Sequence, residues 1–495
     1  MKDQKRWMTN WIRALVVGTL IAGTVPLSVM AEEKGWVNEN GAVHFVDSNG
    51  SYAKNEWKTS QGVSYYLDGE GNLAKNTWID GTYYAGEDGS MTKESWIYVD
   101  ENEGSMKSGW YYLGRNGKVE KNDWKTIEKA KYCFDSDGRM RTGWHYENGD
   151  IYYLGNGSEG YTRSGWYFLE SNGKKRPAEG SISKDLTPDS ENGRWYYFQS
   201  NGKARKSENG VPKEAAIDGK KYYFDENGVM LTGWQCVKEK AEPGDGTGIS
   251  RFVYLGGKED GMLKGQWLET SERPWDTKAW STALNVQAVR KTNAEETALM
   301  KKDGSRWFYL ENNGSPLFLS ADATGVKDGA VKIDGKYYFF DSYGVCQSGL
   351  IKFTSGGKME TAYFDPEAGG AMSIGRNTNA VDKKDKVYTF CSGTSGSEKG
   401  CGVTGEKDGF LYNNGLLVSA KEGSSYGSFK VAGQIYLVNE NGKVQTEEKK
   451  YSSNGKTAYV IENNTVFTSD ENGEKKSEAV GLSLPYAGWK IQYRR

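Results

Sequence analysis

The sequence has 495 residues, enough for several ordinary domains, but its composition is unlike that of a globular enzyme. It contains 64 Gly, 32 Tyr, 17 Trp and 16 Phe against 9 Pro and 2 His. Such a composition argues against the broad aliphatic core of a two-layer enzyme domain and favours many small aromatic cores. The formal net charge is −2, from 64 basic and 66 acidic residues with no basic stripe, which argues against a nucleic-acid partner.

Residues 1–31 are typical of a signal peptide. Basic residues lie between Lys2 and Arg13, an apolar run follows from Ala14 to Val25, and small residues precede an expected cleavage after Ala31. The apolar run is shorter than the ~20 residues that a spanning helix needs, and no later segment is long enough. We therefore expect a secreted chain with no transmembrane segment in its mature form. Leu484-Pro485-Tyr486-Ala487-Gly488 lacks the Thr of a sortase signal, so retention at the cell surface would be non-covalent.

An internal repeat dominates residues 32–266. The clearest copy runs from Tyr222 through Gly228 and Met230 to Trp234, at offsets of six, eight and twelve residues. The same spacing, with the Trp at offset twelve or thirteen, begins at Tyr65, Tyr83, Tyr111 and Tyr132.

The residue types in the repeat predict a β-hairpin. Paired aromatic residues favour a strand, the Asp-Glu-Asn-Gly type of segment that follows favours a turn, and the apolar residue and Trp would open a second strand. A single hairpin is marginally stable in water, so consecutive hairpins must stack their rings. The expected fold class is all-β, an elongated solenoid of tandem β-hairpin repeats with aromatic inter-repeat packing.

Residues 267–306 are expected to form a junction or insertion, because Ala283–Val289 and Asn293–Met300 have a composition that permits a helix. Residues 307–495 are expected to be degenerate repeats with irregular loops, especially over 371–409. They keep the repeat spacing at Tyr338 but contain no Trp between Trp307 and Trp489.

The repeat columns and the Gly-Trp steps, such as Gly143-Trp144, resemble the choline-binding and glucan-binding cell-wall repeats of Gram-positive surface proteins, over about residues 35–267. The resemblance implies a hairpin solenoid whose rings form shallow cages for the choline of teichoic acid or for glucan. Family repeats often carry a Trp directly before the paired Tyr. Trp195 and Trp307 keep it, whereas Ser64, Thr82 and Lys221 replace it. At Trp110 and Trp166, which directly precede a Tyr, one ring is predicted to serve both columns.

Aromatic rings suit a quaternary ammonium ion, which has no N–H to donate, and equally suit the apolar face of a sugar. The alternative for each ring is packing alone, because the same rings are the only sizeable core of the hairpins. The candidate ligand-binding residues are Trp57, Tyr65, Trp78, Tyr83, Trp96, Tyr111, Trp124, Tyr132, Trp144, Trp166, Tyr222 and Trp234.

No catalytic, metal-binding or cofactor-binding residue is nominated. His44 occupies a repeat column and His145 follows a column Trp, so neither is typical of a general base. The Asp/Asn/Gly segments are too short for a calcium loop and are interpreted as turns. Of the five cysteines, Cys133 and Cys346 stand in apolar columns and are expected to be buried, while a bridge between Cys391 and Cys401 is left open.

The sequence thus predicts a secreted, non-catalytic protein that attaches to cell-envelope polymers, either choline-bearing teichoic acid or glucan, at the cell surface. Two other hypotheses stand beside it. One is an adhesin or toxin-like module that binds host glycans through the same rings. The other is an envelope-remodelling hydrolase whose activity the motifs do not reveal.

Overall fold

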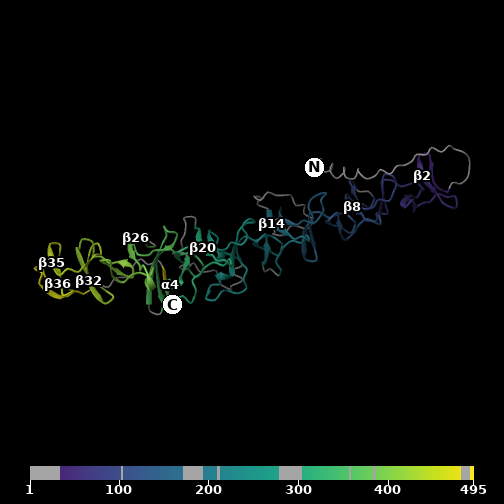
Figure 1. Cartoon of the computed structure of the whole chain (residues 1–495). Helices are drawn as coiled ribbons and strands as arrows, with labels where there is room; N and C mark the ends of the chain where they lie inside the picture. Colours follow the sequence, from purple (N-terminus) through teal and green to yellow (C-terminus); the bar gives the residue numbers. More distant parts are fainter. Residues whose placement is uncertain are drawn as a thin grey trace. The chain divides into compact units, whose positions relative to one another are not determined.

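The computed structural model describes residues 34–101, 104–170, 193–208, 212–277, 304–355, 358–382, 386–480 and 491–494 (Figure 1). The predicted signal peptide, the helix-permitting residues 283–300 and the segment Leu484–Gly488 lie outside these residues. The regular structure is almost entirely β, and within the described ranges the only α-helix is α4 (Val326–Gly329). The prediction of an all-β chain of tandem hairpins is confirmed.

The chain forms two compact units, one of residues 1–142 and 157–161 and the other of residues 143–156 and 162–495. The first unit consists of antiparallel two-stranded hairpins. Their strands are β1 (Gly35–Glu39) with β2 (Ala42–Val46), β3 (Glu56–Ser60) with β4 (Val63–Leu67), β5 (Thr77–Ile79) with β6 (Tyr83–Ala85), β7 (Ser95–Val99) with β8 (Gly109–Leu113), and β9 (Trp124–Ile127) with β10 (Ala130–Cys133).

The second unit begins with further hairpins of the same kind. Residues 267–306 start and end in two strands of one hairpin, β19 and β20, so that this segment is a long connection inside a repeat. The pairs are β11 (Trp144–Glu147) with β12 (Asp150–Tyr153), β13 (Gly165–Glu170) with β14 (Gly193–Phe198), β15 (Lys213–Ile217) with β16 (Lys220–Phe224), β17 (Gly233–Cys236) with β18 (Phe252–Leu255), β19 (Gln266–Thr270) with β20 (Arg306–Leu310), and β21 (Ala330–Ile333) with β22 (Lys336–Phe339).

The strands pair differently from the expected hairpin. In most hairpins the first strand carries a Trp and pairs with the Tyr-bearing strand that follows it along the chain, whereas the expectation joined a Tyr-bearing strand to the next Trp. After the Tyr strand β16, a single bridge links Phe224 to Met230. The carboxylate of Asp225 accepts the backbone N–H groups of Asn227 and Val229, both at 2.9 Å. The Asp225 carboxylate therefore closes a turn. The two N–H groups that it accepts are not available for pairing between strands, so the hairpin ends at this turn.

Several of the hairpin turns lie at Asn-Gly or Asp-Gly pairs between the two strands of a hairpin. In the turn between β15 and β16, Asp218 has φ 48° and Gly219 has φ 77°. Two consecutive residues with positive φ define the type I′ turn, whose twist matches that of a two-stranded hairpin. Asp80-Gly81 and Asn148-Gly149 have the same left-handed angles.

In eight repeats a backbone hydrogen bond joins the repeat to an earlier hairpin. An apolar residue that follows the second strand donates its N–H to the carbonyl of the residue just before the residue pair, usually aromatic, of the earlier hairpin, with N···O distances of 2.7–2.9 Å. These bonds give the stacked hairpins a main-chain connection in addition to their side-chain packing. The pairs are Leu73 to Val43, Met91 to Ser64, Val119 to Thr82, Met140 to Trp110, Ala204 to Ile151, Met230 to Trp195, Met262 to Lys221 and Cys346 to Trp307.

From residue 349 onward the hairpins give way to larger sheets. β23 (Gly349–Ser355) lies between β24 (Lys358–Asp365) and the parallel strand β38 (Ile491–Arg494), and β25 (Ala371–Met372) extends the sheet. Three further sheets follow. They contain β26 (Arg376–Val381), β27 (Val387–Cys391), β30 (Leu416–Leu417), β29 (Phe410–Asn413) and β28 (Gly405–Lys407); β31 (Tyr426–Val431), β32 (Gln434–Asn439) and β33 (Val444–Gln445); and β34 (Lys450–Ser453), β35 (Lys456–Glu462), β36 (Thr465–Ser469) and β37 (Lys475–Glu478).

The prediction of irregular loops over residues 371–409 is therefore wrong for the described part of that stretch. Strands β25 to β28 fall within it, and β26 and β27 pair with each other. The Gly, Ser and Thr residues that suggested loops occur in the connections and on the exposed strand faces. The apolar residues that define the strands are widely spaced, with Ala380 and Phe390 both buried.

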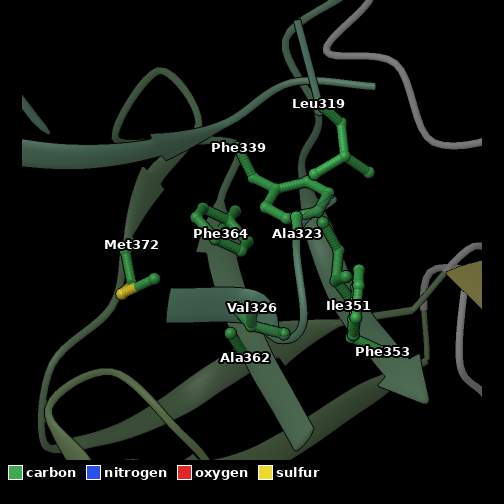
Figure 2. Close-up of a cluster of buried hydrophobic side chains, with 9 residues drawn as sticks. All are labelled: Leu319, Ala323, Val326, Phe339, Ile351, Phe353, Ala362, Phe364 and Met372. Atoms are coloured by element: carbon green, nitrogen blue, oxygen red, sulfur yellow. The ribbon is translucent and has the colours of Figure 1, made fainter. Parts of the chain in front are cut away.

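The core of this region differs from the ring stacks of the hairpins. Figure 2 shows one buried cluster to which β22, α4, β23, β24 and β25 all contribute. Phe339 and Phe364 pack with ring centroids 5.6 Å apart, and aliphatic side chains surround them. The members are Leu319, Ala323, Val326, Phe339, Ile351, Phe353, Ala362, Phe364 and Met372.

The cysteine predictions can be compared directly. Cys133 and Cys346 are buried, as expected. Cys391 and Cys401 are present as thiols, without a bridge between them. Within the described part of the chain, no helix combines the length and apolar character needed to cross a membrane.

Candidate aromatic binding sites

Three junctions between hairpins carry the same group of two Trp rings and one Tyr ring. The first Trp comes from the first strand of a hairpin, the second Trp from its second strand, and the Tyr from the next hairpin. We call them the first, second and third ring clusters. They consist of Trp96, Trp110 and Tyr132; Trp166, Trp195 and Tyr222; and Trp267, Trp307 and Tyr338.

The geometry of the clusters is nearly identical. The two Trp centroids lie 6.4, 6.3 and 6.3 Å apart at interplanar angles of 87°, 88° and 80°. The Tyr centroid lies 4.8 Å from the first Trp in every cluster, at 61°, 66° and 69°. Near-perpendicular rings pack edge to face, and the ring faces that remain uncovered can contact a cation.

Strand periodicity explains why these rings meet. Trp166 stands directly across from Tyr197, and Trp195 is two residues before Tyr197, so both Trp rings lie on one face of the hairpin. Tyr222, the first of its Tyr pair, projects from the next hairpin toward Trp166. The Gly-rich turns allow the hairpins to approach closely, since a Cβ at Gly138 would lie 2.9 Å from the side chain of Val119.

The inter-repeat hydrogen bond holds the second Trp in place. Met140 donates to the carbonyl of Trp110 at 2.7 Å, and Met230 donates to that of Trp195 at 2.8 Å. The same two methionines are buried and pack with the rings of their clusters. In the third cluster Cys346 takes both roles, and burial raises the pKa of its thiol to about 12. Each cluster therefore has a sulfur-bearing apolar side chain packed against it.

The Tyr rings of the clusters stay neutral, and the Trp rings are partly open. Burial raises the pKa of Tyr222 and of Tyr338, so both phenols stay protonated at neutral pH. The six Trp rings are neither fully buried nor fully exposed. A partly open ring can both pack on its neighbours and present a face to a ligand.

Four other junctions have a Trp and a facing ring but no second Trp. Trp57 meets Tyr83, Trp78 meets Tyr111, Trp144 meets Tyr196 and Trp234 meets Phe308, with centroids 4.8–5.4 Å apart. The residue in the second Trp position is then Ser64, Thr82, Ile151 or Phe252.

Burial separates these four junctions further. Trp144 and Trp234 are each only 3% exposed and belong to hydrophobic cores, which favours packing over ligand binding. The hydroxyl of Tyr111, a fully buried side chain, donates to the carbonyl of Lys107 at 2.8 Å. Trp57 and Trp78 are partly exposed, but their junctions have a single indole.

Two remaining candidates have other neighbours. Tyr65 packs edge-on against Trp36, with centroids 5.1 Å apart. The ammonium group of Lys131 lies 4.5 Å from the ring centroid of Trp124. Of the sequence candidates, the three clusters bring together Trp96, Tyr132, Trp166 and Tyr222.

Sequence reasoning left five cluster residues out of its candidate list. Three of the five had a signal in the sequence, because a Trp directly before an aromatic pair marks the second position. Trp166, by contrast, lies on a first strand and fills only the first position, so it does not serve both columns. The five residues are Trp110, Trp195, Trp267, Trp307 and Tyr338.

The surroundings of His44 are those of a packed structural side chain. His44 is 9% exposed, stacks on Tyr52 with centroids 4.4 Å apart, and its Nδ1 lies 2.9 Å from the carbonyl oxygen of Gly71. Among the described residues, no group of three or more His, Cys, Asp or Glu side chains is placed to hold a metal ion.

Comparison with known proteins places the repeats in a family. The fold and the ring clusters define an all-β protein of aromatic hairpin repeats. Residues 51–90 and 121–166 match choline-binding repeats, and residues 34–52, 190–204, 216–230 and 301–315 match the cell wall binding repeat. The resemblance predicted from the residues is thereby confirmed: this chain carries choline-binding and cell wall binding repeats.

Individual relatives are distant. Glucosyltransferase-S of Streptococcus mutans is 25% identical over 265 residues, which are 52% of this chain and 15% of that protein. The modular autolysin LytC from Streptococcus pneumoniae is 19% identical, with 64% of this chain and 54% of LytC covered and a TM-score of 0.35. The choline-binding domain of CbpL from the same species is 27% identical, with 40% and 97% covered and a TM-score of 0.24. The chain thus spans only part of the length of the first two relatives.

Proposed function

We propose that this chain is an exported, non-catalytic protein that attaches to the choline-bearing teichoic acid of a bacterial cell wall through its ring clusters. The observation that carries the proposal is the recurrence of one Trp-Trp-Tyr geometry at three junctions. Packing alone does not require two indoles there, because Ser64 and Thr82 fill the second Trp position at other junctions.

The chemistry of choline fits these clusters. A quaternary ammonium ion cannot donate a hydrogen bond, so its recognition depends on ring faces, each contributing about 0.5–2 kcal/mol. Its methyl groups also gain from contact with the apolar side chain packed against each cluster, such as Met140 or Met230.

Weak single sites suffice for attachment to a polymer. Teichoic acid presents many choline groups along one chain, so linked sites raise avidity by about 10²–10⁴-fold when they engage together. The presence of choline-binding repeats supports a cell-wall location for the exported chain.

The test is sedimentation of the mature chain with purified cell walls, competed by free choline and separately by soluble glucan. We expect choline to release the protein and glucan to have no effect. Release by glucan alone would make glucan the ligand, a hypothesis that the match to a glucosyltransferase favours. Failure to sediment would redirect the search to host glycans.

A triple variant tests the sites themselves. W110A/W195A/W307A removes the second Trp of every cluster and is expected to lower wall binding by at least about 100-fold. W57A removes a partly exposed indole at a junction with one Trp and is the matched control, expected to bind walls like the wild type. Equal losses in both proteins would contradict the assignment of the clusters.

The non-catalytic part of the proposal has its own measurement. The purified chain is expected to release no soluble fragments from peptidoglycan or glucan during prolonged incubation. Measurable hydrolysis would replace this proposal with that of an envelope-remodelling enzyme.

A further inference from the structure

The second ring cluster has a cation of the chain's own on one of its rings. The ammonium group of Lys258 lies 5.0 Å from the ring centroid of Trp195, on the indole that completes the cluster. In the first cluster the neighbouring group is a ring, since the centroid of Tyr161 lies 5.9 Å from that of Tyr132. An ammonium over an indole face occupies the type of position that a bound choline would take.

An insertion explains how Lys258 reaches this position. In the Asp-turn segments, the bridge that follows each Tyr strand joins residues six apart, as in Phe224↔Met230 and Phe198↔Ala204. After β18 the bridge joins Leu255 to Met262, seven apart. The turn over residues 256–261 is therefore one residue longer than these Asp-turn segments, and Lys258 lies within it.

The cluster itself holds the longer turn. The hydroxyl of Tyr222, the Tyr of the second cluster, donates to the carbonyl of Lys258 at 2.6 Å. The ammonium of Lys220 donates to the carbonyl of Glu259. Inside the turn, the N–H of Gly256 donates to Gly261 at 2.8 Å, and the N–H of Gly261 donates to Gly257 at 3.0 Å. Lys258 thus projects from a turn tied to β16 at two points.

The charge on Lys258 is only loosely balanced by its own neighbour. Its Nζ lies 2.8 Å from the carboxylate of Glu259, whose side chain is 82% exposed, while the Lys258 side chain is 28% exposed. An ion pair with so exposed a partner is screened by solvent and is weak. Of the two groups beside the Lys258 ammonium, the indole face of Trp195 is less hydrated than the carboxylate of Glu259. The ammonium lies close to both groups.

We propose that Lys258 is a built-in occupant of the second ring cluster, which competes with cationic ligands and makes this cluster weaker for choline than it would be without the lysine. The inference rests on the proposed function. A tethered group has an effective concentration in the millimolar range or above, which is enough to compete with a single weak site. An ammonium is more strongly hydrated than a quaternary ammonium, so choline still displaces it at high concentration.

Lys131 over Trp124 is a second instance of the same arrangement, at 4.5 Å, within the hairpin of β9 and β10. Lys131 occupies the position directly before Tyr132 where the clusters carry their second Trp. At this junction Lys131 therefore stands in the position of the second Trp, and its ammonium group covers the ring of Trp124. The junction thus contains a cation supplied by the chain itself.

The test isolates the second cluster. In a W110A/W307A background, which lacks the second Trp of the other two clusters, choline is titrated by Trp fluorescence with and without K258S. We expect K258S to tighten choline binding by at least about fivefold, and K258Q to give a smaller gain because it keeps the length but loses the charge. K264S removes an exposed lysine near the same turn and is the matched control, with unchanged affinity. Equal affinity with and without K258S overturns the inference.

A ligand-free measurement distinguishes failure of the inference from failure of the proposed function. If Lys258 sits over Trp195, ring currents shift the NMR signals of its ε-methylene protons upfield, and W195A returns them to ordinary values. Ordinary shifts in the wild type overturn the inference even if choline binds. Upfield shifts together with no choline binding by any variant would keep Lys258 on the indole but defeat both choline proposals.

Discussion

The hairpin region up to about residue 347 and the sheet region from residue 349 to residue 478 stabilise β-structure in two different ways. In the hairpins, two-stranded ribbons bury Trp and Tyr rings against the next repeat, and no ribbon has a core of its own. In the sheets, three to five strands pair laterally and enclose Phe and aliphatic side chains. Indoles at the surface of a thin ribbon are accessible to ligands, whereas side chains inside a wider sheet are not. The ring clusters therefore belong to the first region.

The largest effect is expected from a core change in the sheet region. F364A removes a fully buried ring from the cluster of Figure 2 and should cost about 3–5 kcal/mol of unfolding free energy. No Trp lies between Trp307 and Trp489, so Trp fluorescence follows mainly the hairpins and circular dichroism follows both regions. Denaturation by both probes should show an earlier loss of β-structure with little change in fluorescence. F364L is the milder control. Simultaneous loss of both signals would show that the two regions unfold together.

A buried carboxyl near the end of the hairpin region is expected to give the stability a pH dependence. Asp341 is 3% exposed, and its Oδ1 accepts the N–H groups of Tyr343 and Val345, both at 2.9 Å. Burial raises the pKa of Asp341 to about 7, whereas an unfolded Asp has a pKa of about 3.9. Between these values the folded chain keeps a proton that the unfolded chain has lost. Stability should therefore fall as the pH rises from about 4 to 7, by at most about 4 kcal/mol.

Thermal unfolding between pH 4 and 8 measures this dependence, and D341N should flatten the profile because an amide does not titrate. Asp68 accepts the corresponding N–H groups, of Glu70 and Asn72, in a more exposed turn. D68N is the matched control and should leave the profile of the wild type in place. An identical profile for D341N and the wild type would assign the pH dependence to other groups.

Within the hairpins, two Trp variants separate the loss of choline binding from the loss of stability. W110A removes a partly exposed indole and should weaken choline binding at the first cluster by at least about tenfold, at a stability cost of about 1–2 kcal/mol. W144A removes an indole that is 3% exposed and should cost about 3–5 kcal/mol without touching a cluster of two Trp rings. Calorimetric titration and thermal melts of both variants give the comparison. If W144A weakened choline binding more than W110A did, and W110A cost more stability, Trp144 would be the binding residue and Trp110 the packing residue.

The smallest expected effect concerns the turn glycines with positive φ, which both regions contain. Gly219 in the hairpins and Gly409 in the sheets have φ of 77° and 79°, with no atom within 4 Å of an added Cβ. G219A and G409A should each cost about 1 kcal/mol, because the strain is in the backbone and not in the surroundings. G246A lies at a loop glycine outside the left-handed region and should change stability by less than about 0.5 kcal/mol. Unequal losses at Gly219 and Gly409 would show that the regions differ in their turns as well as in their packing.

The sequence by itself determined the all-β class, the repeat and the family, because all three follow from local spacing. Paired aromatic residues, Asp/Asn-Gly turns and a Trp twelve or thirteen residues after the first Tyr recur along residues 32–266, and His44, Cys133 and Cys346 were correctly placed in packed columns. The three-dimensional structure decided which strand pairs with which. The carboxylate of Asp225 removes N–H groups from the ladder on one side of the Tyr strand, while Asp218-Gly219 supplies the hairpin turn on the other.

The tertiary structure also decided which rings form a site. A column of Trp residues looks uniform in the sequence, yet Trp144 is buried, Trp124 is covered by Lys131, and Trp96 meets a second indole. These differences depend on residues in other strands and on the next hairpin. One inserted turn residue brings Lys258 to Trp195, 63 positions earlier in the chain. Such contacts arise from stacking between repeats, which local spacing does not encode.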